Sequence, residues 1–233
     1  MNEDVASLHK IDILKKVPIF SEISSKDLEK IVAVTHHRKY RKDNMILIEE
    51  EAGQTMFILM SGQVKISRIS EDGREVILAV MGAGEFFGEL SLLDGQSRSA
   101  NVTVIKDAEM LLINRDDFLN LLNEFPRIAI QLLRELASRM RKSDSQIKSL
   151  SLKNATGKVT GTIHRLAEDI GVRADNRVHI ENLPTQQDLA NMAGTSRETI
   201  SRVLQKLAND KYITRDGSKL IITDYERFKK DFI

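Results

Sequence analysis

The stretch TQQDLANMAGTSRETISRVLQKLANDKYI, residues 185–213, decides how the C-terminal part of the chain folds. Thr185 is a typical cap for a short helix, and Gly194 supplies the break that ends this helix. Thr195 or Ser196 can cap the helix that follows. The stretch therefore predicts two helices joined by a tight glycine turn, which is the pattern of a helix-turn-helix.

The second of these helices separates its apolar from its polar side chains. Its apolar positions follow the i, i+3, i+4, i+7 spacing of one buried stripe and are Ile200, Val203, Leu204 and Leu207. The opposite face carries Arg197, Glu198, Ser201, Arg202 and Gln205. An arginine can fork onto guanine and a carboxylate can accept from the amino group of cytosine, so this face suits DNA base edges. A merely solvated polar face is the alternative; the glycine turn and the two-helix spacing favour DNA binding.

Two details support this interpretation. Glu198 stands where it can close a capping box on Thr195 at the start of the second helix. Downstream, residues 212–214 and 220–223 predict two short strands around a turn at 216–218. A hairpin that follows a helix-turn-helix is typical of a winged DNA-binding domain.

Upstream lies a stretch that favours one long helix. Residues 116–152 contain no glycine, and Pro126 is placed near the start of the helix. A heptad seam follows, with Leu133, Met140 and Ile147 at one core position and Leu136, Ser143 and Leu150 at the other. Such a seam usually packs on a partner, and a second copy of the chain is the simplest one. The alternative is that the seam lies on the chain's own β-rich domain, and both can hold in part.

The chain up to about residue 122 is predicted to be rich in β-strands. An amphipathic helix at 25–31 comes first, and short apolar runs then alternate with turns. The runs are residues 45–48, 56–60, 64–67, 76–80, 102–105 and 110–113. Tight turns are predicted at 61–63 and 71–74. Many short strands at regular spacing predict a sandwich or barrel of the jelly-roll type.

The composition excludes several classes of protein. The 233 residues are 41% hydrophobic and include no cysteine, which excludes disulfides, thiolate metal sites and cysteine-held iron–sulfur clusters. The longest apolar run, 76–81, is too short to span a membrane, and the polar N-terminus does not resemble a secretory signal. We therefore expect a soluble cytoplasmic protein without a metal. Because no nucleophile–base pair or metal-ligand cluster appears, we expect no enzyme.

A second stretch, FGELSLLDGQSRSANV at 87–102, places Glu89 and Arg98 among small and apolar residues. Together with LKKVPIFSEIS at 14–24 and TSRETISRVL at 195–204, it resembles the cyclic AMP receptor protein / fumarate–nitrate regulator (CRP/FNR) family of bacterial transcription factors. The order and spacing of the three stretches agree with this family over nearly the whole chain. The stretch 87–102 resembles the phosphate-binding cassette of cyclic-nucleotide-binding domains.

The resemblance implies an α+β fold in three parts. Residues 1–122 would form a cyclic-nucleotide-binding β-roll of the jelly-roll type, 123–153 a dimerisation helix, and 154–233 a winged helix-turn-helix domain. The implied function is a homodimeric transcription regulator that responds to a cyclic nucleotide, with cyclic AMP as the favoured effector. Its implied partners are a pseudo-palindromic double-stranded DNA operator, a second copy of the chain and RNA polymerase. Ligand binding would reorient the DNA-binding domains about a hinge near 152–156.

The resemblance also assigns roles in the nucleotide pocket. Arg98 would bind the cyclic phosphate with help from Ser99, because a planar guanidinium offers two aligned donors to one buried negative charge. Glu89 would accept from the ribose 2′-hydroxyl, and Gly88 and Leu90 would contribute backbone groups. The alternative is a structural Arg98–Glu89 salt bridge in a site that has lost its ligand.

The base contacts implied by the resemblance fall on Ser143 and Asp144. In the cyclic AMP receptor protein, two adjacent hydroxyl residues contact adenine, so Asp144 departs from the pattern. A carboxylate could accept from the adenine amino group or from the N1–H and amino group of guanine. This departure leaves the identity of the nucleotide open, with cyclic GMP as the other candidate.

On the DNA side, the resemblance extends to single residues. Arg197, Glu198 and Arg202 match the family's base-contacting residues, which implies a TGTGA-type half-site. The other predicted DNA-binding residues are Thr185, Gln187, Ser196 and Ser201, with Thr185 and Ser196 as phosphate contacts.

Other functions are compatible with parts of the sequence. A haem sensor of the same family needs an axial ligand, and His36 and His37 are candidates only in principle, since adjacent histidines are usually surface residues. A same-fold regulator that is constitutive, or that answers another ligand, stays open. A regulatory module of a kinase or channel is compatible with the cassette, but the helix-turn-helix argues against it.

Overall fold

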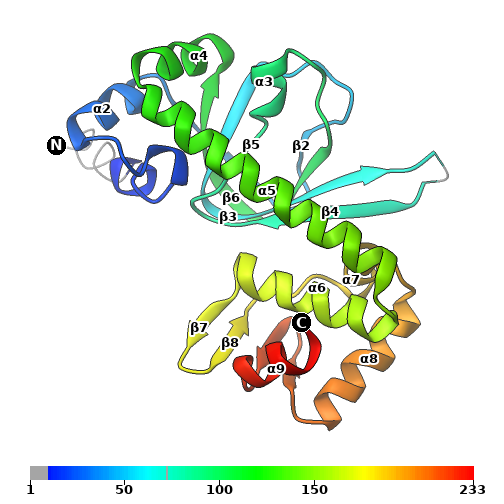
Figure 1. Ribbon diagram of the computed structural model, residues 1–233. Coiled ribbons are helices and arrows are strands. Elements are labelled where there is room, and N and C mark those ends of the chain that lie inside the picture. Colours follow the sequence, from blue (N-terminus) through cyan, green and yellow to red (C-terminus); the bar gives the residue numbers. More distant parts are fainter. Residues whose placement is uncertain (1–9, 72) are drawn as a thin grey trace. The chain divides into compact units, whose positions relative to one another are not determined.

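The computed structural model describes residues 10–71 and 73–233 (Figure 1). The polar N-terminus, on which the expectation of no secretory signal rested, lies almost wholly outside the described residues, as does one residue of the predicted turn at 71–74. The chain divides into two compact units. We call residues 1–67 with 81–141 the N-terminal unit, and 68–80 with 142–233 the C-terminal unit.

The first sheet is built around two long strands, which pair antiparallel with each other. The elements are β1 (His36–Tyr40), β2 (Met45–Leu47), β3 (Thr55–Ile69), β4 (Glu75–Met81), β5 (Phe86–Phe87) and β6 (Asn101–Asn114). Strands β3 and β6 pair along most of their length. The sheet order is β1-β6-β3-β4, with β2 on β6 and β5 on β3. This arrangement confirms the predicted β-roll.

The predicted tight turn at 61–63 is wrong, because β3 runs straight through it. The pairing of β3 with β6 shifts register on both sides of Ser61 and Gln63, which makes this a bulge rather than a turn. Gly62 has a φ of +88°, and a Cβ there would come within 2.3 Å of the carbonyl oxygen of Asp107. Only glycine allows this close approach at a positive φ. The residue therefore marks a β-bulge within the strand and not the end of the strand.

Helices cover the N-terminal unit. They are a 3-10 turn at Pro18–Phe20, α2 (Ser25–Ala33), α3 (Leu90–Asp94), α4 (Arg115–Glu124) and α5 (Pro126–Leu152). Helix α2 begins as predicted, because the Ser24 side chain accepts from the backbone N–H of Asp27. Fully buried side chains from these helices, including Leu28, Phe118 and Ile128, join Ile58 of the sheet in one core. This core holds the start of α5 against the β-roll.

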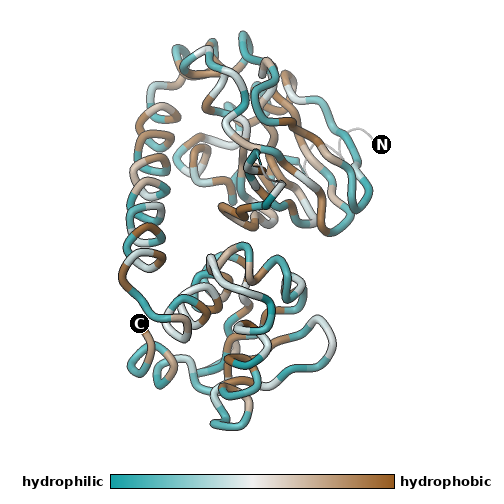
Figure 2. The backbone as a smooth tube through the Cα atoms, turned by 90° about the vertical axis from the view of Figure 1, so that its right-hand side faces the viewer, coloured by the Kyte–Doolittle hydropathy of each residue, from teal (hydrophilic) through white to brown (hydrophobic). Residues whose placement is uncertain are grey.

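Helix α5 begins at Pro126, close to the predicted start at residue 123, and its apolar seam is largely exposed. The exposed fractions are 67% for Leu133, 68% for Met140 and 63% for Ile147, which stand one heptad apart. Figure 2 shows apolar residues recurring among polar ones along this helix. Leu136, at the other seam position, packs partly buried on the core of the N-terminal unit. The interpretation that the seam lies on the chain's own domain therefore holds for Leu136. Packing of the exposed seam positions on a second copy stays a prediction.

The C-terminal unit contains more strands than predicted. Its elements are α6 (Ala155–Ile170), β7 (Val172–Ala174), β8 (Arg177–Ile180), α7 (Gln186–Ala193), α8 (Arg197–Asn209), β9 (Ile213–Asp216), β10 (Lys219–Ile222) and α9 (Tyr225–Phe232). They include a four-stranded sheet in the order β7-β8-β10-β9. The predicted hairpin is confirmed as β9–β10. Strands β7 and β8 and helix α9 were missed, because each is too short to show a clear periodicity.

The helix-turn-helix is confirmed, with one correction to its capping. Gly194 ends α7 in the left-handed region at a φ of +57°. Ser196, and not Thr195, caps α8, because its side chain accepts from the backbone N–H of Thr199. The capping box belongs to α7, where Thr185 and Asp188 cap each other's backbone. Helix α8 can therefore begin immediately after the turn.

None of the helices in the part of the chain that the structure describes is both long and apolar enough to span a bilayer.

Candidate nucleotide pocket and DNA-binding surface

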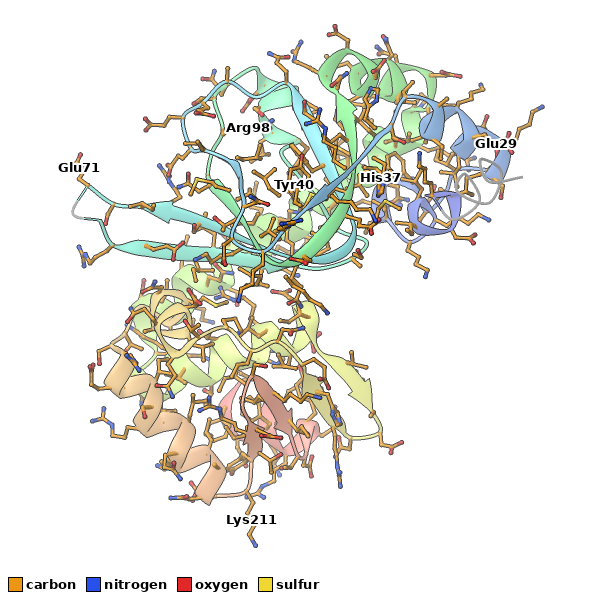
Figure 3. The ribbon with its side chains drawn as sticks, turned by 180° about the vertical axis from the view of Figure 1, so that it is seen from behind. Glu29, His37, Tyr40, Glu71, Arg98 and Lys211 are labelled. Atoms are coloured by element: carbon orange, nitrogen blue, oxygen red, sulfur yellow. The ribbon has the colours of Figure 1, made fainter. Side chains whose placement is uncertain are left out.

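A small cavity of about 100 Å³ lies in the N-terminal unit, beside α3 and the strands. It brings together five of the seven residues predicted to bind the nucleotide. Its lining comprises Leu47, Ile66, Met81, Phe87, Gly88, Glu89, Leu90, Ser91, Arg98, Ser99, Ala100, Val102 and Arg139. Figure 3 shows Arg98 within the strand-rich part of this unit. The cavity is smaller than most ligand sites, which enclose roughly 300–1,000 Å³.

Arg98 is buried and held by three protein acceptors. One terminal nitrogen, Nη1, donates to the carbonyl oxygen of Gly88 and to Oγ of Ser91, both at 2.8 Å. The other, Nη2, donates to the carbonyl oxygen of Thr55 at 2.7 Å. Burial lowers the pKa of the guanidinium, and the nearby carboxylate of Glu89 opposes that shift. The guanidinium therefore lies in a polar cradle that is already made for a planar cation.

Two glycines keep the space that this cradle needs. A Cβ on Gly53 would come within 2.4 Å of Nε of Arg98 and of Oγ of Ser91. A Cβ on Gly88 would lie 2.9 Å from Nη1 of Arg98, and the φ of Gly88 is +80°. Gly53 was not predicted, because it lies far from the cassette in the sequence and no local motif marks it.

Glu89 is buried as well, but its partner is Arg139 and not Arg98. Nη1 of Arg139 lies 3.0 Å from Oε1 of Glu89. The same guanidinium donates to the carbonyl oxygen of Phe86 at 2.8 Å and pairs with Glu135 at 3.2 Å. It also lies 4.5 Å above the ring centroid of Phe86. The alternative of an Arg98–Glu89 salt bridge is therefore wrong.

Burial dominates the electrostatics of Glu89. It raises the pKa of this carboxyl above its ordinary value, and the positive charge of Arg139 only partly offsets the shift. Arg139 was not predicted as a site residue. The only sequence signal is its spacing of four residues from both Glu135 and Ser143 on one helix, which is too common to identify a site.

Two other predicted residues lie outside the cavity lining. Ser143 and Asp144 are exposed on α5, within the C-terminal unit. The structure places them one helical turn beyond Arg139, and their role as base contacts stays a prediction. Ser99 and Leu90 do line the cavity and are exposed at its edge.

The second site is the polar face of α8. Ile200, Val203, Leu204 and Leu207 are buried, which confirms the predicted apolar stripe. The opposite face borders a shallow depression lined by Gln186, Arg197, Glu198, Ser201, Arg202 and Gln205. Gln186, at the start of α7, is an addition to the predicted set. A helix that buries one face and exposes a mixed polar one can enter a DNA groove without unfolding.

Thr185 and Ser196 were predicted as phosphate contacts, and in the structure both also cap helices. The hydroxyl of Thr185 donates to Asp188 at 2.7 Å, and the hydroxyl of Ser196 lies 3.2 Å from that of Thr199. Both residues are exposed at helix N-termini, where backbone N–H groups attract anions. Gln187, also exposed, donates to Asn191 at 3.0 Å.

Glu198 stands in the first turn of α8 and is exposed. Its own backbone N–H and the hydroxyl of Ser196 lower the pKa of its carboxyl. The side chain is therefore ionised at neutral pH and available as an acceptor.

The two adjacent histidines are surface residues on β1. Nε2 of His37 lies 2.9 Å from Oε2 of Glu109, and His36 is exposed. Across residues 10–71 and 73–233, no group of three or more His, Cys, Asp or Glu side chains could hold a metal ion.

Comparison with known proteins identifies two domains in the chain. Residues 37–125 match the family model of the cyclic nucleotide-binding domain. Residues 157–230 match the model of the Crp-like helix-turn-helix domain. The two models cover the pocket residues Glu89 and Arg98 and the whole of α8.

Curated relatives match over most of the chain. The "Cyclic AMP receptor protein" of Thermus thermophilus is 34% identical over 198 residues, which cover 84% of this chain and 88% of that protein. The "CRP-like cAMP-activated global transcriptional regulator" of Mycobacterium tuberculosis is 29% identical over 219 residues, or 94% of this chain and 98% of that protein.

Solved structures show the same fold. FixK2 from Bradyrhizobium japonicum aligns with a TM-score of 0.75 at 22% identity, covering 84% of this chain and 96% of that one. The catabolite activator protein of Thermus thermophilus aligns with a TM-score of 0.54 at 30% identity, covering 91% and 97%.

The fold and its two sites define a DNA-binding regulator with a cyclic-nucleotide-binding domain. The chain belongs to the CRP/FNR family. Members of this family are transcription regulators and not enzymes.

Proposed function

We propose that the protein is a homodimeric transcription regulator that binds cyclic AMP in the N-terminal unit and responds by reorienting its DNA-binding helices. The observation that carries this proposal is the pairing, in one chain, of a buried Arg98–Glu89 pocket with an exposed α8 face. The pocket suits an anionic ligand that also carries a hydroxyl donor, and the face of α8 suits DNA. RNA polymerase is the further partner that this function implies.

Binding requires Arg98 to exchange partners. Its guanidinium donates to three protein oxygens, and a cyclic phosphate would take over some of these donors. The ribose hydroxyl would donate to Glu89 beside Arg139, which lies on α5. A ligand in this cavity would therefore lie beside α5, the helix that carries the apolar seam. Ligand binding could then change the position of α5.

The exposed stripe supports the dimer. Leu133, Met140 and Ile147 form a seam of large apolar side chains on one face of α5. Water-exposed apolar side chains at heptad spacing are typical of a coiled-coil interface, and a second copy presents the same seam.

Support for cyclic AMP comes from the relatives named above, which are described as cAMP-activated or as a cyclic AMP receptor. Asp144 leaves cyclic GMP as the second candidate, because a carboxylate can also accept from guanine. The exposed position of this residue on α5 is compatible with either base.

Calorimetric titration of the full chain with cyclic AMP and cyclic GMP tests the effector. We expect saturable binding of cyclic AMP, and operator affinity measured at fixed salt should rise when it is present. Tighter binding of cyclic GMP would reassign the base. Operator binding without any response to either nucleotide would favour the constitutive alternative or another ligand.

Sedimentation tests the dimer. Met140→Glu combined with Ile147→Glu would place like charges face to face in an apolar interface, so we expect a monomer with weakened operator binding. Ser145→Glu is the control, because it adds a charge at an exposed polar position of the same helix. A double variant that still sediments as a dimer would place the interface elsewhere.

A further inference from the structure

A second and larger cavity, of about 350 Å³, lies within the C-terminal unit. It is formed by the last turns of α5 and by α6, with one residue of α7. Its lining comprises Lys142, Ser145, Gln146, Lys148, Ser149, Leu150, Leu152, Lys153, Lys158, Gly161, Thr162, His164, Arg165, Glu168, Asp169, Met192 and Ile233. Neither the nucleotide pocket nor the polar face of α8 uses any of these residues, and Leu150 is also one of the predicted seam positions. Its volume falls within the range of small-molecule sites.

The two helices approach closely at one edge of this cavity. A Cβ on Gly161 of α6 would lie 3.3 Å from Oγ of Ser149 on α5. Lys142 of α5 and Asp169 of α6 are joined by an ion pair of 2.9 Å. These contacts hold α5 and α6 together beside the cavity, which is partly open to solvent.

Arg165 is the unusual residue of the cavity. Its Nε and Nη2 atoms are buried, and neither has a hydrogen-bond partner among the residues that the structure describes. Asp169, one turn further along α6, is already paired with Lys142. Buried guanidinium nitrogens are rarely left without an acceptor, because each missing hydrogen bond is costly. An acceptor from outside the chain would remove this cost.

The charge around Arg165 favours an anion. Five cationic side chains line the cavity, namely Lys142, Lys148, Lys153, Lys158 and Arg165, against the two acids Glu168 and Asp169. Both acids are engaged: Glu168 pairs with Arg173 at 2.7 Å and accepts from the hydroxyl of Tyr225, and Asp169 pairs with Lys142. The cavity therefore has an excess of positive charge.

The lining also has an apolar part, beside polar residues such as Ser149 and Thr162. Leu150 and Leu152 of α5 and Met192 of α7 contribute large hydrophobic side chains, and Ile233 adds another. An inorganic anion would leave this surface in contact with water, whereas an anion with a hydrocarbon tail would cover it. The cavity thus has two chemically different parts, a group of cationic side chains around Arg165 and a group of apolar side chains.

We propose that this cavity binds a small organic anion, with a carboxylate or phosphate head on Arg165 and an apolar tail against Leu150 and Met192. The planar guanidinium can hold either head through two parallel hydrogen bonds. Residues Lys153 and Asn154 form the short link between α5 and α6. The ligand would contact both helices and so bridge this link. Its occupancy would therefore stabilise one arrangement of the link that leads into the DNA-binding domain.

Binding to the full chain tests the two parts of the ligand. The probes are hexanoate, hexyl phosphate, inorganic phosphate and hexanol, each titrated calorimetrically. We expect at least one of the two tailed anions to bind more tightly than both inorganic phosphate and hexanol, and the tighter of the two identifies the head. Equal binding of all four probes, or no binding of either tailed anion, would overturn the proposal.

Arg165→Met tests the residue, with Arg141→Met as the control at an exposed position of α5 outside the cavity. We expect Arg165→Met to weaken binding of the tailed anion about tenfold or more, since hydrogen bonds to charged groups are lost. The control should bind like the parent, and cyclic AMP should bind equally to all three proteins. An Arg165→Met variant that binds the tailed anion as the parent does would refute the site.

The unfolding temperature without any probe separates this role from a structural one. Because two buried nitrogens of Arg165 have no acceptor among the described residues, Arg165→Met should unfold at the same or a higher temperature than the parent. A clearly lower unfolding temperature would show that the protein or a second copy already satisfies Arg165, and would overturn the proposal.

Discussion

The two sites of this protein hold their charged side chains in opposite ways. In the nucleotide pocket, Glu89 is 3% and Arg98 is 6% exposed, and both are bonded to other parts of the chain. On α8, Arg197, Glu198 and Arg202 are all exposed. A ligand in the pocket must therefore replace protein partners of Glu89 and Arg98. A DNA base at α8 would replace only water around the exposed side chains.

This difference has a consequence for regulation. A ligand that displaces internal hydrogen bonds changes the structure that made them, so binding and conformation are coupled. A ligand that meets a preformed exposed face needs no such change. The pocket is thus suited to sensing, and the helix is suited to reading a sequence.

The largest expected effect is the loss of the pocket cation. Arg98→Leu should weaken cyclic-nucleotide binding by about 2–5 kcal/mol, because the phosphate would enter a buried site without its counter-charge. Calorimetry measures the loss. Arg38→Leu is the control, since this arginine is exposed on β1. Binding by Arg98→Leu at the parent's affinity would show that the pocket is wrongly assigned.

The second prediction separates the two sites by stability. Arg139→Met removes the partner of buried Glu89 and should lower the free energy of unfolding of the N-terminal unit by about 1–3 kcal/mol. Arg202→Met, on the exposed face of α8, should change it by no more than about 0.5 kcal/mol. Denaturant titration measures both. Equal effects of the two substitutions would remove the contrast between buried and exposed charges.

The third prediction concerns sequence readout by α8. Arg197→Ala should cost roughly 1–3 kcal/mol of discrimination at one base pair. Selection from random duplexes should recover a TGTGA-type half-site with the parent and a relaxed position with the variant. Lys206→Ala is the control, because Lys206 is exposed on α8 but does not line the depression. A variant that keeps the parent's preferences would refute the docking of this helix.

The smallest effect concerns pH. Burial raises the pKa of Glu89 in the folded chain, so the folded state holds this proton more tightly than the unfolded state does. The stabilisation from this proton is present below the ordinary glutamate pKa near 4.5 and is lost as pH rises through the folded pKa. The stability of the parent relative to Glu89→Gln should therefore fall as pH rises above that value.

Unfolding temperatures of the parent and Glu89→Gln across this pH window check the prediction. Glu51→Gln, at an exposed position, is the control and should show no such trend. A parent that gains stability over Glu89→Gln with rising pH would mean that the ion pair with Arg139 outweighs the burial of the carboxylate.

Local features of the sequence carried much of the prediction. The helix end at Gly194 and the buried stripe of α8 were predicted correctly, and the start of α5 was predicted to within about three residues. Each depends on interactions among residues within about two helical turns, so periodicity and capping chemistry are sufficient to find them. The resemblance of residues 87–102 likewise located the pocket, because one short segment supplies most of its lining.

The partners of the buried charged residues were decided by the tertiary structure alone. Gly53 and Thr55 reach Arg98 from another part of the β-roll, and Arg139 reaches Glu89 from α5. The turn predicted at Gly62 became a bulge because the facing strand continues past it. Arg165 looks like any helical arginine in the sequence, and only the folded chain shows that two of its guanidinium nitrogens are buried beside a cavity. Periodicity reports which face of a helix or strand is apolar, but which distant segment covers that face depends on how the whole chain packs.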